Sequence, residues 1–168
     1  MSRNSPSLAV KVGDPVPSIG LRATDGYLLN LRSWVGKSPV GLLFFTGPTA
    51  TGDARKIGES LARDLAAAVP RLDEAGVAVA GITTDNERQQ GEFASTLDLS
   101  FLLMSDERLI ASQSLGVPVA TKRGTTNVVT PVLIGVDETG FIRGIFWDPD
   151  PRLMVAIVLE VFREPLPA

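Results

Sequence analysis

Residues 40–54 read Val-Gly-Leu-Leu-Phe-Phe-Thr-Gly-Pro-Thr-Ala-Thr-Gly-Asp-Ala, and they decide the fold. The run Val40–Phe45 is almost entirely apolar, which is typical of a strand buried on both faces of a sheet. A polar loop over residues 46–53 follows this strand. Beyond the loop, apolar residues recur at the spacing of a helix, namely Ile57, Leu61, Leu65 and Leu72. The stretch is therefore predicted to be a strand, a loop and a helix in succession.

The same alternation continues on both sides of this stretch. On the amino-terminal side, Asp25-Gly26 between two short apolar stretches predicts a β-hairpin over residues 21–31. Further strands are expected at 77–82, 101–104, 132–136 and 141–147, and further helices at 84–97, 106–115 and 151–162. The last two strands are joined by a tight turn and cannot be parallel. We therefore expect an α/β fold with a central mixed β-sheet flanked by helices.

Local signals add four expectations. Pro70 cannot continue a regular helix, so we expect a kink or break just before it. Glu74-Ala75-Gly76 is typical of a helix end with glycine in the left-handed conformation. Thr84 or Asp85 is expected to cap the following helix. Residues 120–127 are expected to form a polar loop.

Composition excludes several classes of function. The 168 residues suit one domain, and 16 basic against 19 acidic residues give a net charge of −3. That balance is too acidic and too evenly mixed for a nucleic-acid-binding surface. The chain has no Cys and no His, which excludes thiolate nucleophiles, imidazole catalysis, iron–sulfur clusters and metal sites built on these residues. We expect no metal and no cofactor.

The chain divides into an arm, a domain and a tail. Residues 1–11 are expected to be an N-terminal arm, residues 12–164 the domain and residues 165–168 a tail. No run approaches 18 apolar residues, so no transmembrane segment is expected. The polar start lacks the apolar run of a secretory signal, and the expected location is cytoplasmic.

Several phrases, taken in order, resemble the peroxiredoxins, the alkyl hydroperoxide reductase and thiol-specific antioxidant (AhpC/TSA) family of the thioredoxin-like fold. The chain start is similar to the family's V-G-D-x-A-P, and later phrases match its hairpin, strand ends and final turn. These phrases are Val12–Pro17, Thr24–Leu31, Gly36-Lys37, Gly81–Asp85, Phe101–Asp106, Leu115–Val117 and Asp137–Arg143. The resemblance covers about residues 12–162. It implies a thioredoxin-like three-layer sandwich with an N-terminal β-hairpin.

The active-site positions depart from that family. Peroxiredoxins carry P-x-x-x-T-x-x-C after the first core strand, and the cysteine attacks peroxide as a thiolate. The same spacing here falls on Gly47, Thr51 and Ala54, and the position of the family's activating arginine falls on Pro131. An alanine methyl group cannot be deprotonated or oxidised. The resemblance therefore implies an antioxidant, oxidoreductase-like frame without its redox chemistry, and no catalytic residue is expected.

A second alignment, to thioredoxins, gives the same result. Their C-x-x-C motif falls on Thr51-Gly52-Asp53-Ala54. Thr130-Pro131 is similar to their cis-proline dipeptide, so Pro131 is expected to be cis and to shape a concave surface facing Thr51 and Ala54.

The candidate binding residues each have a structural alternative. They are Thr51, Gly52, Asp53, Thr130, Pro131 and Trp147. Thr51 could hold a ligand or cap a helix, and Asp53 could act as a carboxylate or favour a helix N-terminus. The Gly52 and Asp53 amides could bind an anion. Trp147 could anchor a partner or pack in the core.

Other polar side chains are weaker candidates. They are Arg55, Lys56, Lys122, Arg123 and Tyr27, and they are expected to be solvated surface residues.

Three functions remain open. The favoured one is a redox-inactive pseudoenzyme that binds a protein partner, or a second copy of itself, through the former active-site face. The alternative is a thiol peroxidase represented as a Cys-to-Ala variant at position 54. The third is a cysteine-independent enzyme or ligand binder that uses Asp53, Arg55 or Lys122.

Overall fold

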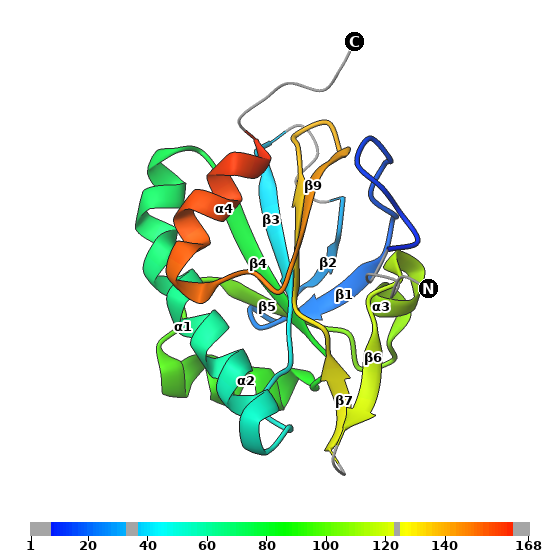
Figure 1. Ribbon diagram of the computed structural model, residues 1–168, viewed down its shortest axis with the longest axis vertical. Coiled ribbons are helices and arrows are strands. Elements are labelled where there is room, and N and C mark those ends of the chain that lie inside the picture. The colour runs from blue at the N-terminus through cyan, green and yellow to red at the C-terminus, as the bar shows by residue number, and fades with distance from the viewer. Residues whose placement is uncertain (1–7, 33–36, 123–124, 163–168) are drawn as a thin grey trace, which may run out of the picture.

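A mixed seven-stranded sheet runs through the molecule in the computed structural model, which describes residues 8–32, 37–122 and 125–162 (Figure 1). Its strand order is β2-β1-β5-β4-β3-β8-β9. The central strands β3, β4 and β5 are parallel, and all other pairs are antiparallel. The strands are β1 (Gly20–Ala23), β2 (Leu28–Asn30), β3 (Val40–Phe44), β4 (Ala78–Thr83), β5 (Leu102–Ser105), β8 (Val132–Val136) and β9 (Ile142–Trp147). The predicted mixed sheet and the β1–β2 hairpin are confirmed.

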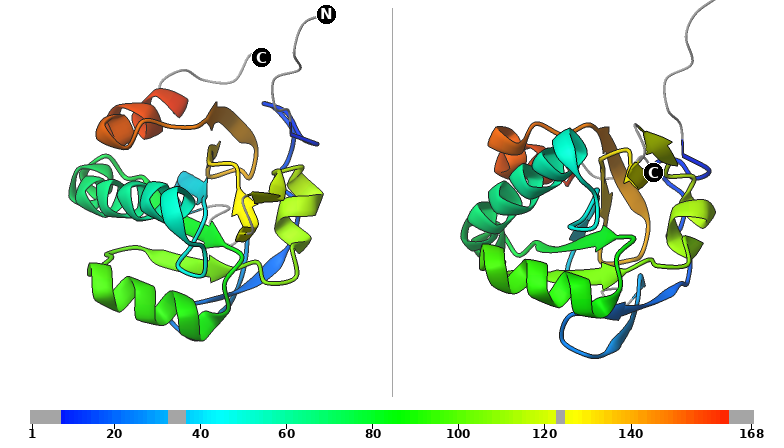
Figure 2. Two further views of the ribbon diagram at one scale, coloured as in Figure 1. Left: turned by 60° about the horizontal axis from the view of Figure 1, so that its bottom comes forward. Right: turned by 90° about the horizontal axis from the view of Figure 1, so that it is seen from below.

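Helices cover both faces of the sheet and complete three layers (Figure 2). One side carries α1 (Gly52–Glu74), α2 (Glu87–Leu97) and α4 (Met154–Val161), which follows the short 3-10 helix η1 (Pro151–Leu153). The other side carries α3 (Ile110–Leu115). Strand β3 explains this arrangement, because Leu42 and Phe44 join one buried cluster while Leu43 joins the other. The apolar run 40–45 therefore belongs to an interior strand that is covered on both faces.

Helix α1 continues through Pro70, so the expected break is wrong. A proline at position 70 has no N–H to donate to the carbonyl four residues earlier, which belongs to Ala66. The hydroxyl of Ser100 donates a hydrogen bond to that carbonyl at 3.3 Å. A side chain from the α2–β5 connection thus replaces the missing donor. The helix ends as predicted, with Gly76 at φ +76°.

Two other expectations need correction. Helix α2 is capped by Asn86, whose side chain accepts from the Gln89 N–H in a reciprocal capping box, and not by Thr84 or Asp85. The expected loop over residues 120–127 contains parts of two paired strands, β6 (Val119–Lys122) and β7 (Thr125–Val129). The alternation in this segment was too polar to reveal a strand. Arg123 lies outside the described residues.

The end of the predicted arm lies against the domain. The Ala9 N–H donates to the Leu115 carbonyl at 2.8 Å, and Leu8 and Val10 pack on the core cluster beside α3. The division at residue 11 stays a prediction, as does the tail. Within the described ranges, no helix is both long and apolar enough to cross a membrane.

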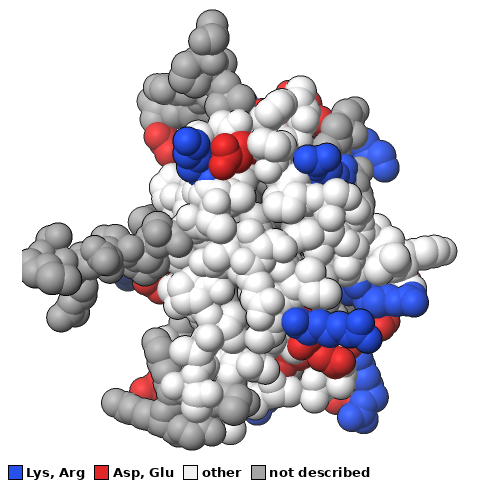
Figure 3. Space-filling view, turned by 90° about the vertical axis from the view of Figure 1, so that its right-hand side faces the viewer, with Lys and Arg blue, Asp and Glu red and all other residues white. Residues whose placement is uncertain are grey.

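Charged side chains on the face that carries α3 and β6 lie toward its two ends (Figure 3). Acidic and basic groups stand side by side there, and Lys and Arg do not gather into a basic patch on this view of the described residues.

Candidate functional site

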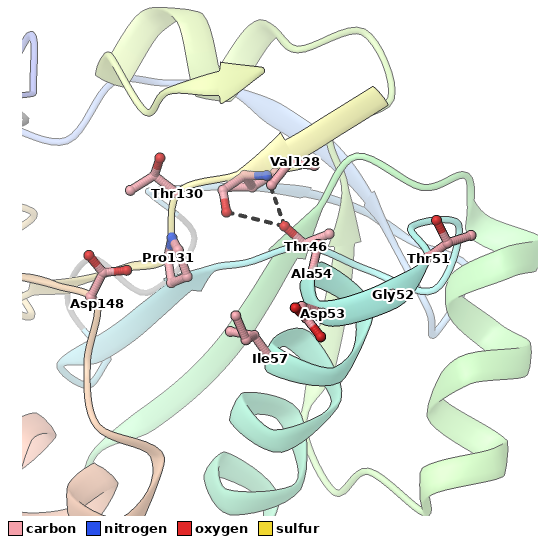
Figure 4. A pocket seen from close by; sticks show the side chains of 11 residues that line it. Thr46, Thr51, Gly52, Asp53, Ala54, Ile57, Val128, Thr130, Pro131 and Asp148 are labelled. Atoms are coloured by element: carbon pink, nitrogen blue, oxygen red, sulfur yellow. Dashed lines mark hydrogen bonds between the residues drawn. The ribbon is translucent and has the colours of Figure 1, made fainter. Parts of the chain in front are cut away.

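A hollow of about 640 Å³ lies where the carboxyl end of β3, the start of α1 and the β7–β8 connection meet (Figure 4). Most of its wall belongs to three segments that are far apart in sequence. Its lining residues are Thr46, Thr51, Gly52, Asp53, Ala54, Ile57, Val128, Val129, Thr130, Pro131 and Asp148. Ala54, where the resemblance expects the family's cysteine, therefore lines a concave surface.

Thr46 fixes the wall of this hollow to the core. It follows the buried strand β3 and is itself buried. Its Oγ1 donates to the Val129 carbonyl at 3.1 Å and accepts from the Val129 N–H at 2.8 Å (Figure 4). One hydroxyl thus satisfies both backbone groups of a buried residue that would otherwise lack partners. The end of β7 is held against the end of β3 by this pair of bonds.

Gly47 lies behind the hollow and packs against a buried carboxylate. A β-carbon at position 47 would overlap Asp85 Oδ2. Asp85 Oδ1 accepts from the Thr49 N–H at 3.0 Å and from the Thr49 hydroxyl at 2.5 Å, which ties the loop to the end of β4. Gly47, where the resemblance expects the family's proline, leaves room for the carboxylate of Asp85.

The first turn of α1 forms one side of the hollow. Thr51 holds the N-cap position with extended backbone, but its side chain makes no capping hydrogen bond. Gly52 has φ +62°, which favours glycine, and Asp53 and Ala54 follow it. Further along, a β-carbon at the buried Gly58 would overlap the Thr46 carbonyl oxygen. The missing side chain at position 58 lets α1 pack closely on the site loop.

The Thr130–Pro131 dipeptide forms the opposite wall, and its peptide bond is trans. The described residues contain no cis peptide bond, so the expectation of a cis proline is wrong. Here the Thr130 N–H donates to the Pro118 carbonyl at 3.0 Å, and the Pro131 carbonyl accepts from the Asp148 N–H at 2.8 Å. These bonds hold a trans proline at the entrance to β8, where the absent N–H breaks no sheet pairing. Pro131 still lines the concave surface.

The structure brings together five of the six candidate binding residues, namely Thr51, Gly52, Asp53, Thr130 and Pro131. Trp147 is the exception. It is half-buried and packs against the core, and its neighbour Asp148 lines the hollow instead. Asp148 adopts φ +45°, a conformation that aspartate tolerates better than most residues. The sequence did not indicate Asp148 as a site residue, because the run Asp148–Pro151 is typical of a helix start.

Of the weaker candidates, Arg55, Lys56 and Tyr27 lie outside the hollow. Arg55 pairs with Glu59 at 3.0 Å along the helix, and Lys56 is exposed. Tyr27 is exposed at the hairpin turn. Lys122 lies in β6, and its side chain lies outside what the structure describes. Sequence reasoning missed Thr46 and Ile57, although a polar residue directly after a buried strand could have indicated the former.

Two carboxylates line the hollow, and no cation of the described residues does. Asp53 and Asp148 are both exposed, and they lie on opposite sides of Ile57 and Pro131 (Figure 4). No described lysine or arginine is among the lining residues, and neither carboxylate forms an ion pair with a described residue. The described residues also hold no group of three potential metal-binding side chains.

Comparison with known families identifies the family to which this fold and sequence belong. The family model described as Redoxin matches residues 11–161. The chain belongs to the redoxin family. The peroxiredoxin resemblance seen in the sequence is thereby confirmed, and so is the absence of the cysteine that defines their chemistry.

Individual relatives of this redoxin are also peroxiredoxins. It is 32% identical to Peroxiredoxin Bcp of Escherichia coli K12 over 108 residues, which are 64% of this chain and 65% of that protein. The match thus spans just under two thirds of that relative's length. Peroxidoxin BcpB from Mycobacterium tuberculosis superposes with a TM-score of 0.76 at 21% identity, covering 91% of this chain and 96% of its own. A cysteine-to-serine mutant of Xanthomonas campestris Peroxiredoxin Q gives 0.74 at 16%, covering 94% and 98%. These likenesses confirm the thioredoxin-like fold.

Proposed function

We propose that this redoxin is a redox-inactive member of its family that binds a protein partner through the hollow and its rim, as a subunit or adaptor. The observation that carries the proposal is the hollow itself. Its wall is held by Thr46 and lined by Thr51, Ala54 and Pro131, and Ala54 stands where the resemblance expects the reactive cysteine. A surface that has lost its chemistry but keeps a defined concave shape suits binding.

The surroundings of Ala54 support loss of function over a single inactivating substitution. By the resemblance, Gly47 and Pro131 stand where the family carries a proline and an arginine, and Gly47 is packed against Asp85. No cation lines the described part of the hollow to stabilise a thiolate. Three departures that share one site favour a binding protein over a peroxidase carrying one changed residue.

The test is purification of the tagged chain from its source cells, followed by intact mass measurement of everything that co-migrates. We expect a stoichiometric companion, which can be a different protein or a second copy. Ala54→Trp places a bulky side chain in the hollow and should abolish the complex. Ser95→Trp adds the same side chain to the exposed surface of α2 and should leave the complex intact.

Two results would overturn this function. One is a chain that migrates alone as a monomer, and the other is a companion that Ala54→Trp retains as well as Ser95→Trp does. A native chain heavier than this sequence by one sulfur atom would instead identify a peroxidase represented by its Cys-to-Ala variant. The proposal includes a cytoplasmic location, which fractionation of the same cells tests.

A further inference from the structure

The charge of the hollow indicates which partner side chain it accepts. Its described lining carries two negative groups, the carboxylates of Asp53 and Asp148, and one positive helix end, the amino end of α1. That helix end contributes about half a positive elementary charge, whereas the two carboxylates contribute two full negative charges. The balance of the described groups is negative, so an anionic group is disfavoured and a cationic group is favoured.

The floor between the carboxylates is apolar. Ile57 is 54% exposed, a large value for a side chain of this type, and it lies with Pro131 between the two acids (Figure 4). A purely apolar occupant would cover this floor but would also strip water from two charges without pairing them. A long basic side chain can both cover the apolar floor and pair with the carboxylates, since its aliphatic stem covers apolar surface while its charged head stays with polar groups.

We propose that the hollow accepts a lysine or arginine side chain of the protein partner, with its stem on Ile57 and Pro131 and its charged head between Asp53 and Asp148. This inference rests on the proposed function and names the chemistry of the docking residue. A free metal ion is a poorer occupant, because the described residues offer no third acidic ligand.

The test uses two peptides that differ in one charge. The probes are the capped pentapeptides Gly-Leu-Lys-Leu-Gly and Gly-Leu-norleucine-Leu-Gly, titrated into the full ¹⁵N-labelled chain while the amide signals of Asp53, Ala54 and Asp148 are followed. The lysine peptide should bind at least tenfold more tightly than its norleucine match. Tenfold corresponds to about 1.4 kcal/mol, which two exposed ion pairs can supply. The preference should weaken as salt is raised.

A pair of matched double variants isolates the carboxylates. Asp53→Asn with Asp148→Asn should remove the preference for lysine, and asparagine tolerates the positive φ at position 148. Asp73→Asn with Glu74→Gln removes the same charge at the far end of α1, where both side chains are exposed, and should keep the preference.

The inference is overturned if both peptides bind equally, if the lysine peptide leaves the three amide signals unmoved, or if the preference survives in the Asp53→Asn/Asp148→Asn chain. These outcomes do not affect the proposed function, which depends on the separate comparison of Ala54→Trp with Ser95→Trp. A partner that is lost on Ala54→Trp but shows no dependence on the two acids would leave binding intact and refute the cationic docking residue.

Discussion

The space beside the backbone of Gly47 holds only one side chain, and the carboxylate of Asp85 occupies it. The carboxylate of Asp85 lies where the β-carbon of any larger residue at position 47 would stand, and its other oxygen holds Thr49. The site loop is therefore shaped by a pair of residues that belong to different strand ends.

Substitution of Gly47 by Ala should destabilise the protein by about 1–3 kcal/mol, since the added methyl group must displace a buried carboxylate. Asp85→Ala should also destabilise, because the Thr49 N–H loses its acceptor. Urea unfolding of both single variants and the double variant measures their coupling. The double variant should lose less stability than the two single losses combined. Full additivity would show that the two residues do not compete for space.

Ala54→Cys should not create a peroxidase. The helix start lowers the pKa of such a thiol, but the carboxylate of Asp53 next to it raises the pKa, and no described cation lines the hollow. We expect the thiol to titrate at or above the ordinary value of about 8.5. Thiolate absorbance against pH and peroxide consumption with a thiol donor check this. Rapid turnover of peroxide would contradict it and would favour the peroxidase alternative.

Thr46→Val should cost about 1–3 kcal/mol, because it leaves the buried N–H and carbonyl of Val129 without their partner. Hydrogen exchange of the Val129 amide should accelerate more than the loss of global stability alone explains. Thr46→Ser keeps the hydroxyl and serves as the control, with most of the protection retained. Equal exchange in all three proteins would show that the two hydrogen bonds do not hold the wall.

Pro70 and Ser100 should be energetically coupled. Ser100→Ala should cost about 0.5–1 kcal/mol in the natural chain, since the Ala66 carbonyl loses its donor. In a Pro70→Ala background the new N–H at position 70 can bond to that carbonyl within the helix. The same Ser100→Ala change should then cost almost nothing. A constant cost in both backgrounds, measured by urea unfolding, would refute the replacement of one donor by the other.

Asp137 should make stability depend on pH at the acidic end. Burial alone would raise its pKa, but hydrogen bonds from the Thr139 hydroxyl, the Phe141 and Thr139 amides and Arg143 outweigh it and lower the pKa below the ordinary 3.8. A lowered folded-state pKa contributes stability above pH 3.8 that disappears as pH falls through the folded value. Asp137→Asn should be about 1–3 kcal/mol less stable at pH 7. Urea unfolding from pH 7 to pH 2 should show this gap narrowing below about pH 4, whereas a constant gap would contradict it.

The sequence predicted the strands whose apolar pattern is unbroken, and it failed where tertiary contacts decide. The run 40–45 and the Asp25-Gly26 turn carry local signals that the fold uses directly. The continuity of α1 through Pro70 depends on Ser100, 30 residues away, which no local pattern reveals. Strands β6 and β7 stabilise each other as a pair, and β7 is further held by Thr46. Because these contacts come from outside each strand, the polar sequence of the segment did not indicate strands.

The candidate site was predicted in part. Thr51, Gly52, Asp53 and Ala54 are consecutive in the chain, and the spacing of the family motifs selected them together. Pro131 was expected on the same surface from resemblance, but its trans geometry follows from backbone contacts on both sides. Asp148 was missed because its place on the rim depends on a left-handed backbone that its sequence neighbours do not require.

The two hydrogen bonds between Thr46 and Val129 join residues 83 positions apart. A chain still emerging from the ribosome without β7 cannot form the hollow, and neither can a chain whose carboxyl-terminal half has come undone. A ligand that binds in the hollow would therefore bind only molecules whose folding is complete. By mass action, such a ligand also raises the melting temperature of the entire domain, although it touches only one end of it.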